Sequence, residues 1–448
     1  MIIQHTLSTP EWAALARKYT TINKRPPTWH DAYRPNYIML YHKRGDIWYF
    51  PPSARWQGYK EEKKLSEPLV YTADESWVPE DMIEEQDSIY GHMMLDDWRW
   101  GMVVMKTGRG KGNMILKMCE GIQQKTLIIT NTVNNLHDLV ARFKKSTNYE
   151  VGEWHGKKKD IQDITVTTHT SFSKDVSVFS WHFGVLMYDE CDYRMTKKMI
   201  HAICTVDVEA VYGFTGTPRR QEIDSDDLTL FFWGFYKWED QDNNGYNILP
   251  TIYRIIYKWE RLVRENFHEL KDWLSEDEDR LEKQVSLVKK TCDYGTKVWL
   301  VLTDRVQDCL EYCERLNKIW VRAWVMHGKT KPEDDKKLIE EITEHGGVIV
   351  GNYQKVGRWQ DIPSISNMYL FFATKFEGNV VQAVWRWLRA YPWKDVVRLY
   401  DWVDENNLAR QGYERQQAYE REYKNVDDEW NVTTCKIKRV VIKEEDKE

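Results

Sequence analysis

Glycine is scarce and tryptophan is abundant in this chain of 448 residues, which contains 23 glycines and 22 tryptophans. Glycine usually makes up about 7% of a protein, or roughly 31 residues at this length. No stretch approaches the roughly 18 apolar residues of a membrane helix, and the first residues lack the pattern of a secretion signal. The sequence therefore predicts a cytoplasmic protein with no membrane partner.

Paired cysteines and an excess of basic residues are also missing. The seven cysteines form no C-x-x-C pair, which favours reduced thiols over disulfides or a cysteine zinc site. The 64 Lys and Arg residues against 70 Asp and Glu residues give a net charge of −6. Compact DNA-binding modules are usually basic. Any nucleic-acid surface is therefore expected to be a local groove on a mildly acidic body.

Short apolar runs alternate with amphipathic helical patterns over most of the chain. This alternation predicts an α/β protein in which mainly parallel sheets are flanked by helices. A polar segment at 239–247 separates two such series. The sequence predicts an N-terminal accessory region, two α/β domains, and a C-terminal helix with a short tail, over residues 1–82, 83–248, 249–404 and 405–448 respectively.

The segment Lys106–Gly112, which reads KTGRGKG, has the composition of a phosphate-binding loop. It follows a predicted strand and precedes a predicted helix. Glycines in this position let backbone N–H groups converge on phosphate oxygens, and the helix N-terminus adds positive potential. Lys111 would reach the β- and γ-phosphates of a nucleotide. The alternative interpretation is a glycine-rich turn with a solvated lysine.

Acidic and hydroxyl residues follow two further predicted strands. Asp189 and Glu190 come directly after the apolar run 184–188. An aspartate in this position can hold Mg²⁺ through water, and the adjacent glutamate can act as the general base for water attack. Thr215 and Thr217, in TGTP, could hydrogen-bond to the acidic segment and sense the nucleotide state. Taken alone, each segment also fits an ordinary turn after a buried strand.

Gln382–Arg389, which reads QAVWRWLR, lies on a predicted helix of the second series. Arg386 and Arg389 are three residues apart and share one helix face. Two guanidinium groups so placed can stabilise the charge that develops during phosphoryl transfer. The alternative is a basic helix that faces solvent.

The order and spacing of these four segments resemble superfamily 2 DExD-box helicases, most closely the type III restriction and phage-type branch. The resemblance covers about residues 83–425, where TGRGKG looks like motif I, DECD like motif II, TGTP like motif III, and QAVWRWLR is similar to motif VI. It implies tandem RecA-like domains that use ATP and Mg²⁺ to move along a nucleic acid. DNA is favoured over RNA, in a bacterial or phage-infected cell.

The resemblance also implies a role for each matching residue. The catalytic group is Glu190, Lys111, Arg386, Arg389 and Gln382, and the Mg²⁺ ligand is Asp189. The nucleotide-binding group is Gln86, Thr107, Gly108, Arg109, Gly110, Lys111, Gly112, Asn113 and Asp361. The nucleic-acid group is Thr130, Asn131, Thr168, His169, Thr303 and Arg305.

Two departures from the family pattern stand out. Gly112 occupies the position of a Ser or Thr whose hydroxyl binds Mg²⁺, and Thr107 or Asn113 are the candidates to replace it. Tryptophan occupies places where glycine is usual. Some bacterial lineages and their phages decode UGA as glycine, which leads to the hypothesis that many of these tryptophans are misread glycines. The positions concerned are Trp320, Trp324, Trp359, Trp385 and Trp393.

The leading interpretation is an ATP-dependent DNA or RNA helicase or translocase. Two alternatives remain open: the motor subunit of a restriction or remodelling complex, and a degenerate nucleic-acid-binding protein that does not hydrolyse ATP. Gly112 and Trp385 favour the latter. The N-terminal region is a candidate surface for a protein partner.

Overall fold

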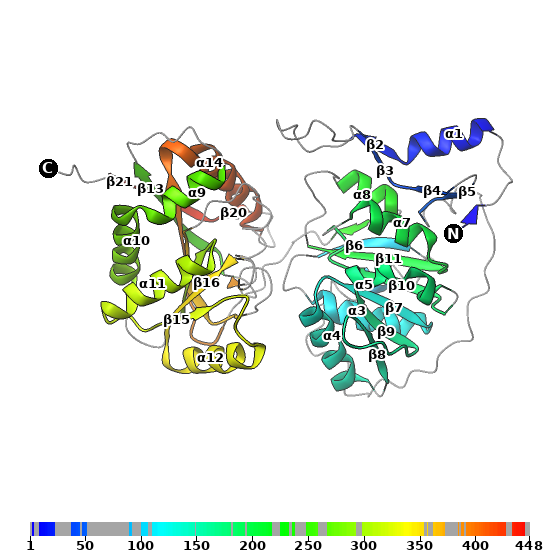
Figure 1. Ribbon diagram of the computed structural model, residues 1–448, viewed down its shortest axis with the longest axis horizontal. Coiled ribbons are helices and arrows are strands. Elements are labelled where there is room, and N and C mark those ends of the chain that lie inside the picture. The colour runs from blue at the N-terminus through cyan, green and yellow to red at the C-terminus, as the bar shows by residue number, and fades with distance from the viewer. Residues whose placement is uncertain are drawn as a thin grey trace. The chain divides into compact units, whose positions relative to one another are not determined.

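A computed structural model of the chain describes residues 2–3, 9–22, 37–44, 47–51, 89–91, 100–105, 110–147, 149–180, 182–192, 195–216, 225–232, 235–237, 248–258, 267–292, 298–353, 356, 362–371, 384, 387–388, 391–426 and 432–443 (Figure 1). By its internal contacts the chain divides into two units, Met1–Trp238 and Glu239–Glu448. Each unit contains its own large sheet and its own buried core.

The first unit is built on a seven-stranded sheet in the order β12-β6-β11-β10-β7-β9-β8, with every neighbouring pair parallel. Parallel neighbours require crossover connections, and helices supply most of them here. The strands are β6 (Trp100–Val104), β7 (Thr126–Thr130), β8 (Val151–Trp154), β9 (Ile164–Thr168), β10 (Val185–Asp189), β11 (Ala210–Thr215) and β12 (Phe235–Lys237).

Helices cover both faces of this sheet, so its central strands are apolar along their whole length. Val103, Ile128 and Met187 pack with helices α3 and α4 in one cluster. The alternate residues Met102 and Leu127 point to the other face and pack with α5 to α8. The helices are α3 (Lys111–Ile122), α4 (Val133–Ser146), α5 (His169–Lys174), α6 (Val176–Phe179), α7 (Lys197–Thr205) and α8 (Ser225–Phe232).

The N-terminal region is part of the first unit and packs against one of its two core clusters. Leu15, Tyr19, Leu40 and Phe50 are buried in the same cluster as α7. Leu15 lies in α1, and the other three residues directly follow α1 or a strand of two small antiparallel sheets, β1-β5-β4 and β2-β3. The elements are β1 (Ile2–Ile3), α1 (Thr9–Lys18), β2 (Thr20–Ile22), β3 (Tyr37–Met39), β4 (His42–Arg44) and β5 (Ile47–Tyr49).

The second unit has a seven-stranded parallel sheet in the order β15-β16-β14-β17-β18-β13-β21. Its last strand comes from the C-terminal tail and pairs with β13, the first strand of the unit. The strands are β13 (Pro250–Lys258), β14 (Val298–Thr303), β15 (Ala323–Met326), β16 (Gly347–Asn352), β17 (Ile365–Leu370), β18 (Val397–Asp404) and β21 (Lys436–Lys443), with a β-hairpin of β19 (Lys424–Val426) and β20 (Val432–Thr434) before the last strand.

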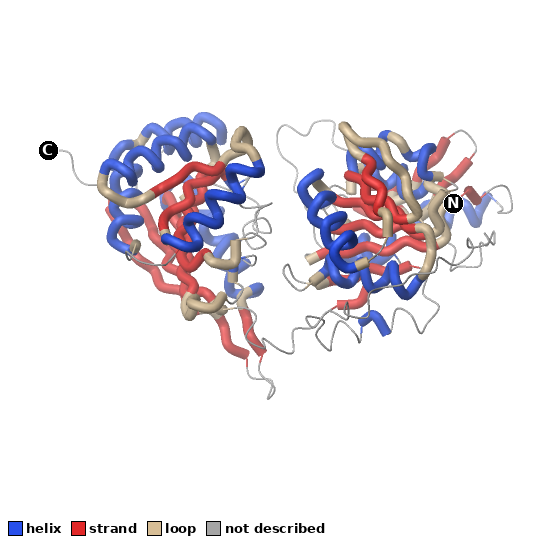
Figure 2. Tube along the Cα trace, turned by 90° about the horizontal axis from the view of Figure 1, so that it is seen from below, coloured by secondary structure: helices blue, strands red, loops and turns tan. Residues whose placement is uncertain are grey.

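Two layers of helices enclose the second sheet, and Figure 2 shows strands between helices in each unit. Val301 and Val350 pack with α9, α10 and α11, whereas Leu300 and Ile349 pack with α12 and α14. The prediction of two parallel α/β domains is therefore confirmed. The helices are α9 (Phe267–Glu276), α10 (Glu278–Thr291), α11 (Val306–Lys318), α12 (Pro332–His345) and α14 (Glu405–Glu422). No helix in the described ranges is long and apolar enough to span a membrane.

Candidate functional site

Lys111 begins helix α3 at the carboxyl edge of the first sheet, directly after the predicted phosphate-binding loop. Gly110 precedes the helix as its N-cap, with φ 78° and ψ 29°. This left-handed conformation is one that glycine adopts without the strain a Cβ would add. The Gly110 carbonyl accepts the first helical hydrogen bond, from the Met114 N–H at 3.0 Å. The backbone thus turns sharply and presents Lys111 at the helix N-terminus.

The Lys111 ammonium lies 3.1 Å from a carboxylate oxygen of Glu190, and the side chains are 9% and 17% exposed. Glu190 follows β10, and Lys111 follows the loop after β6. These two strands flank β11, so their carboxyl ends meet at the same edge. Glu190 has φ 52°, an unusual left-handed conformation for a residue with a side chain. The structure therefore brings together the two residues that the sequence places in motifs I and II.

The acidic segment is tied to the end of β11. The Thr215 hydroxyl donates to Asp192 at 2.5 Å, and the Cys191 N–H donates to the Phe214 carbonyl at 2.9 Å. The expected hydrogen bond between the TGTP hydroxyls and the acidic segment is thus present at Thr215, and Asp192 is its acceptor. The DECD motif includes Asp192, but the sequence does not indicate which of its three carboxylates accepts the hydrogen bond from Thr215.

The Cys191 thiol beside these carboxylates stays protonated. Burial raises its pKa well above the usual value, and the negative charges of Asp192, Glu190 and Asp189 raise it further. A thiol in this state is neither a nucleophile nor a metal ligand. The acidic chemistry at this edge therefore belongs to the carboxylates.

Gly112 lies next to Lys111 in the first turn of α3, where the family pattern has a hydroxyl residue. A Cβ built at this position would meet only the Arg142 side chain, at 3.7 Å, which is an ordinary contact distance. The neighbouring Asn113 side chain accepts a hydrogen bond from Arg142 at 3.2 Å. The backbone therefore has room for Ser or Thr at 112, and the missing hydroxyl is a matter of sequence rather than space.

Gly112→Ser is expected to lower the Mg²⁺ concentration that supports half-maximal ATP hydrolysis, because it supplies a hydroxyl oxygen that can bind the ion. The measurement is a Mg²⁺ titration of ATPase activity. Gly112→Ala is the matched control, since it adds the same Cβ and a similar gain in helix propensity of up to about 1 kcal/mol without an oxygen. Equal Mg²⁺ dependence of the Ser and Ala variants would contradict a metal role for this position.

A second group of predicted residues gathers at the ends of β7 and β9, which are neighbours in the sheet. Thr130 pairs with Thr168 in register. The Asn131 carbonyl lies 3.1 Å from Nδ1 of His169. Thr132 and Thr168 cap α4 and α5, accepting from backbone N–H groups three residues on. The four predicted nucleic-acid residues of this unit therefore form one continuous edge, although much of Thr130, Asn131 and Thr168 is buried.

The two predicted nucleic-acid residues of the second unit, Thr303 and Arg305, make internal contacts. The buried Thr303 hydroxyl donates to the Arg305 carbonyl at 3.2 Å and lies 3.1 Å from the Cys309 sulfur, at the start of α11. The Arg305 guanidinium forms an ion pair with Asp272. In this state the fold uses Thr303 to shape the helix start, and a contact of either residue with nucleic acid stays a prediction.

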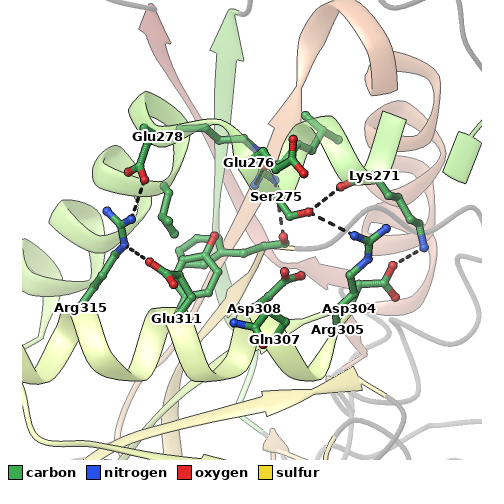
Figure 3. Close-up of a pocket in the computed structure, with 15 residues that line it drawn as sticks. Lys271, Ser275, Glu276, Glu278, Asp304, Arg305, Gln307, Asp308, Glu311 and Arg315 are labelled. Atoms are coloured by element: carbon green, nitrogen blue, oxygen red, sulfur yellow. Dashed lines mark hydrogen bonds and ion pairs between the residues drawn. The ribbon is translucent and has the colours of Figure 1, made fainter. Parts of the chain in front are cut away.

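A cavity of about 430 Å³ lies beside Arg305, between α9, α10 and α11 (Figure 3). Its walls carry both signs of charge, and the charges pair with each other. Lys271 contacts Asp304, and Arg315 lies 2.8 Å from Glu278 and 2.6 Å from Glu311. Burial raises the pKa of the Asp308 carboxyl in the same cavity. Because the cations are matched by carboxylates, the cavity does not have the positive field of a phosphate site.

Several predicted site residues lie outside the described residues, and the structure places none of them. From the first unit these are Gln86, Thr107, Gly108 and Arg109. From the second unit they are Asp361, Gln382, Arg386 and Arg389.

Comparison with known proteins places this site in a family context. The model of the family "Type III restriction enzyme, res subunit" matches residues 80–220, which include Lys111, Asp189, Glu190 and Thr215. The DNA 3'-5' translocase XPB2 of Sulfurisphaera tokodaii is 26% identical over 124 residues, which are 27% of this chain and 28% of that protein. The matched region thus spans little more than a quarter of either protein.

Solved structures agree with the fold. The ATP-dependent type ISP restriction-modification enzyme LlaBIII bound to DNA matches 80% of this chain and 31% of its own, with a TM-score of 0.60 and 12% identity. A fragment assigned as the HsdR subunit of a type I restriction enzyme from Vibrio vulnificus matches 80% of this chain and 67% of its own, with a TM-score of 0.56 and 14% identity. Together with the two parallel sheets, these matches confirm the predicted tandem RecA-like architecture.

Proposed function

We propose, from the match of residues 80–220 to the model of the type III restriction enzyme res subunit, that this chain is an ATP-dependent DNA helicase or translocase. The observation that carries the proposal is the contact between Lys111 and Glu190 at the carboxyl edge of a parallel sheet. Ligands of open α/β sheets bind at this edge. A lysine at a helix N-terminus can bind the phosphates of a nucleoside triphosphate, and the carboxylate beside it can act as the base for hydrolysis.

The Lys111–Glu190 ion pair has a direct consequence for the reaction. While the pair is closed, the Lys111 ammonium is neutralised and the Glu190 carboxylate is engaged. Incoming phosphates compete for Lys111, which releases Glu190 to orient a water and take its proton. Entry of the triphosphate therefore both fills the site and frees the general base.

Mg²⁺ fits this proposal through Asp189, the last residue of β10 and the neighbour of Glu190. A bound Mg²⁺ would neutralise charge that develops on the phosphates. Hard oxygen ligands suit this ion, and the chain supplies a carboxylate at Asp189 but no hydroxyl at Gly112. The affinity for Mg²⁺ is therefore expected to depend strongly on the nucleotide that binds with it.

The Thr215–Asp192 hydrogen bond could transmit the effect of nucleotide binding from Glu190 to β11. Asp192 is two residues from Glu190, and Thr215 ends β11, the strand between the two catalytic strands. A shift of the acidic turn when the Lys111–Glu190 pair opens would change this bond. We infer that it reports the nucleotide state to the segment after β11.

Binding of nucleic acid should be tolerant of sequence and sensitive to salt. The edge that contains Thr130, Asn131, Thr168 and His169 reaches solvent at the half-buried His169, which begins α5, and a polar side chain at a helix N-terminus suits phosphate contacts rather than base recognition. Fluorescence anisotropy with unrelated oligonucleotides should give similar affinities that fall at least roughly tenfold between about 50 and 200 mM salt. A strong preference for one duplex sequence with a flat salt response would contradict this model.

ATP hydrolysis by the purified chain, measured alone and with DNA or RNA, tests the function. Stimulation by DNA supports a DNA motor, and stimulation by RNA alone would move the substrate to RNA. Displacement of a third strand from a triplex without duplex unwinding would indicate a translocase of the kind that restriction complexes use. Binding of ATP with no hydrolysis under any condition would support the degenerate, non-hydrolysing alternative.

A further inference from the structure

Two histidines and a glutamate converge at the edge of the first sheet, away from Lys111 and Glu190. His137 lies on α4, Glu153 lies on β8, and His155 follows that strand directly. Nδ1 of His137 is 3.2 Å from Oε2 of Glu153, and Nε2 of His155 is 4.0 Å from the same oxygen. The three ligand atoms all lie within 4.8 Å of one another. Two imidazoles thus face a single carboxylate oxygen.

These distances are close to those of a tetrahedral metal site. Zinc binds imidazole nitrogen and carboxylate oxygen at about 2.0–2.2 Å, so two such ligands on one ion lie roughly 3.3–3.5 Å apart. The His137–Glu153 distance of 3.2 Å is within about 0.1 Å of this range. The His155–Glu153 distance of 4.0 Å exceeds this range by about half an ångström, so His155 would move toward Glu153 when an ion binds. Three protein ligands would leave a fourth position open for water.

The turn after β8 holds Glu153 and His155 in place. The His155 N–H donates to the Lys158 carbonyl at 2.8 Å, and the Asp160 N–H donates to the Glu153 carbonyl at 3.1 Å. The side chains of Glu153 and His155 are 9% and 8% exposed, whereas that of His137 is 53% exposed. Glu153 and His155 are therefore held in position and shielded from solvent, whereas the exposed His137 leaves a path by which a metal ion can enter.

The protonation states suit a metal. Burial lowers the pKa of His155, and His137 lowers it further, which keeps the His155 imidazole neutral near pH 7. Burial alone would raise the pKa of Glu153, but Lys158, His137 and Lys144 outweigh it, and the net pKa is lowered. Glu153 is therefore a carboxylate. Lys158 occupies its other oxygen, Oε1, at 3.0 Å and leaves Oε2 to the histidines.

We propose that His137, Glu153 and His155 bind one divalent transition-metal ion of the zinc class, which joins α4 to the edge strand β8. Imidazole ligands favour zinc over magnesium or calcium. The nearby positive charges of Lys144, Lys158 and Lys159 oppose a divalent cation, which makes the affinity moderate rather than extreme. The ion would stabilise the sheet edge that borders the Thr168–His169 segment.

The test is titration of the whole, tag-free, metal-stripped chain with ZnCl₂, followed by calorimetry. One Zn²⁺ per chain should bind, with a dissociation constant in the micromolar range or lower. His137→Ala should weaken Zn²⁺ binding at least tenfold, because even residues that only hydrogen-bond to metal ligands change metal affinity by about that factor. The substitution should not disturb folding, since His137 is half-exposed. His345→Ala is the matched control, because His345 also lies beside a glutamate, Glu344, at 3.8 Å. Its affinity should equal that of the parent chain.

Cobalt distinguishes this site from the seven cysteines of the chain. Co²⁺ bound by histidine and glutamate gives only weak visible bands, whereas a cysteine ligand adds a strong thiolate charge-transfer band. The proposal is overturned by an absence of micromolar Zn²⁺ binding, by equal binding in His137→Ala, or by a thiolate band at one equivalent of Co²⁺. Because none of these readouts involves ATP or DNA, they stand or fall separately from the motor function.

Discussion

Glu190→Gln is expected to bind ATP as tightly as the parent chain while hydrolysing it roughly 10²- to 10⁴-fold more slowly, because the amide cannot accept the proton of the attacking water. The amide oxygen can still accept a hydrogen bond from Lys111, which lies 3.1 Å from the native carboxylate. The site should therefore keep its shape. Steady-state hydrolysis and binding of a fluorescent ATP analogue measure the two effects separately.

Glu120→Gln is the matched control for this experiment. Glu120 also pairs with a lysine of helix α3, Lys117, at 3.0 Å, but at the other end of the helix from Lys111. It should hydrolyse ATP at the parental rate. If Glu190→Gln also turns over like the parent, the assignment of the acidic motif is wrong and the catalytic base lies elsewhere.

Trp320→Gly is expected to stabilise the second unit, which would be the reverse of the usual effect of removing a tryptophan. Trp320 follows helix α11 with φ 66°, and 87% of the residue is exposed. The Trp320 and Val321 N–H groups donate to the Asn317 and Leu316 carbonyls, which is a Schellman motif with its usual glycine position occupied by tryptophan. Relief of the left-handed strain is worth about 1 kcal/mol, or a rise of about 2–4 °C in Tm.

Trp402→Gly provides the contrast, because the Trp402 ring is buried and its indole N–H donates to Asp404 at 3.0 Å. That variant should lose about 3–5 kcal/mol of stability. A lower Tm for Trp320→Gly would contradict the view that position 320 is a glycine site. Thermal unfolding followed by circular dichroism distinguishes the two outcomes.

The same reasoning extends to the motif tryptophans. If about 15 of the 22 tryptophans are UGA codons read as glycine in the cell, the glycine count rises to roughly 38 and tryptophan falls to roughly 7, near ordinary usage. UGA should then stand at codons 320, 359, 385 and 393. A chain with glycine at 359, 385 and 393 should hydrolyse ATP faster than the chain as written. UGG at these codons would refute the recoding hypothesis.

Much of the fold could be predicted from the sequence because parallel strands buried on both faces are continuous apolar runs. The apolar run at 184–188 falls on β10, Val185–Asp189, which pairs in parallel with β7 as the predicted parallel sheet requires. The order of the strands within each sheet could not be predicted, because it depends on which face of the sheet each crossover helix covers. Nothing in the local pattern of β21, which reads KIKRVVIK, indicates that it pairs with β13 from the other end of the unit.

The sequence could indicate candidate site residues where polar or charged side chains directly follow a predicted strand. Lys111 and Glu190 are 79 positions apart in the chain, yet the resemblance to the helicase motifs implied that they share one site, and their side chains lie 3.1 Å apart. The room around Gly112 and the left-handed backbone at Glu190 could not be predicted, because both depend on three-dimensional neighbours. The His137, Glu153 and His155 cluster was missed for the same reason: its spacing matches no sequence motif, and it forms only when α4 packs on β8.

The pairing of β21 with β13 also governs the order in which this protein can fold as it is synthesised. Thr251 emerges from the ribosome early in the second unit, but its partner Lys436 follows only after the other strands of the sheet. Until then, β13 has one unpaired edge, and such edges invite pairing with other chains. The long sequence separation makes this closing step slow. Once formed, β21 becomes the new edge, and its charged residues, Lys436, Lys438, Arg439 and Lys443, discourage further strands from adding.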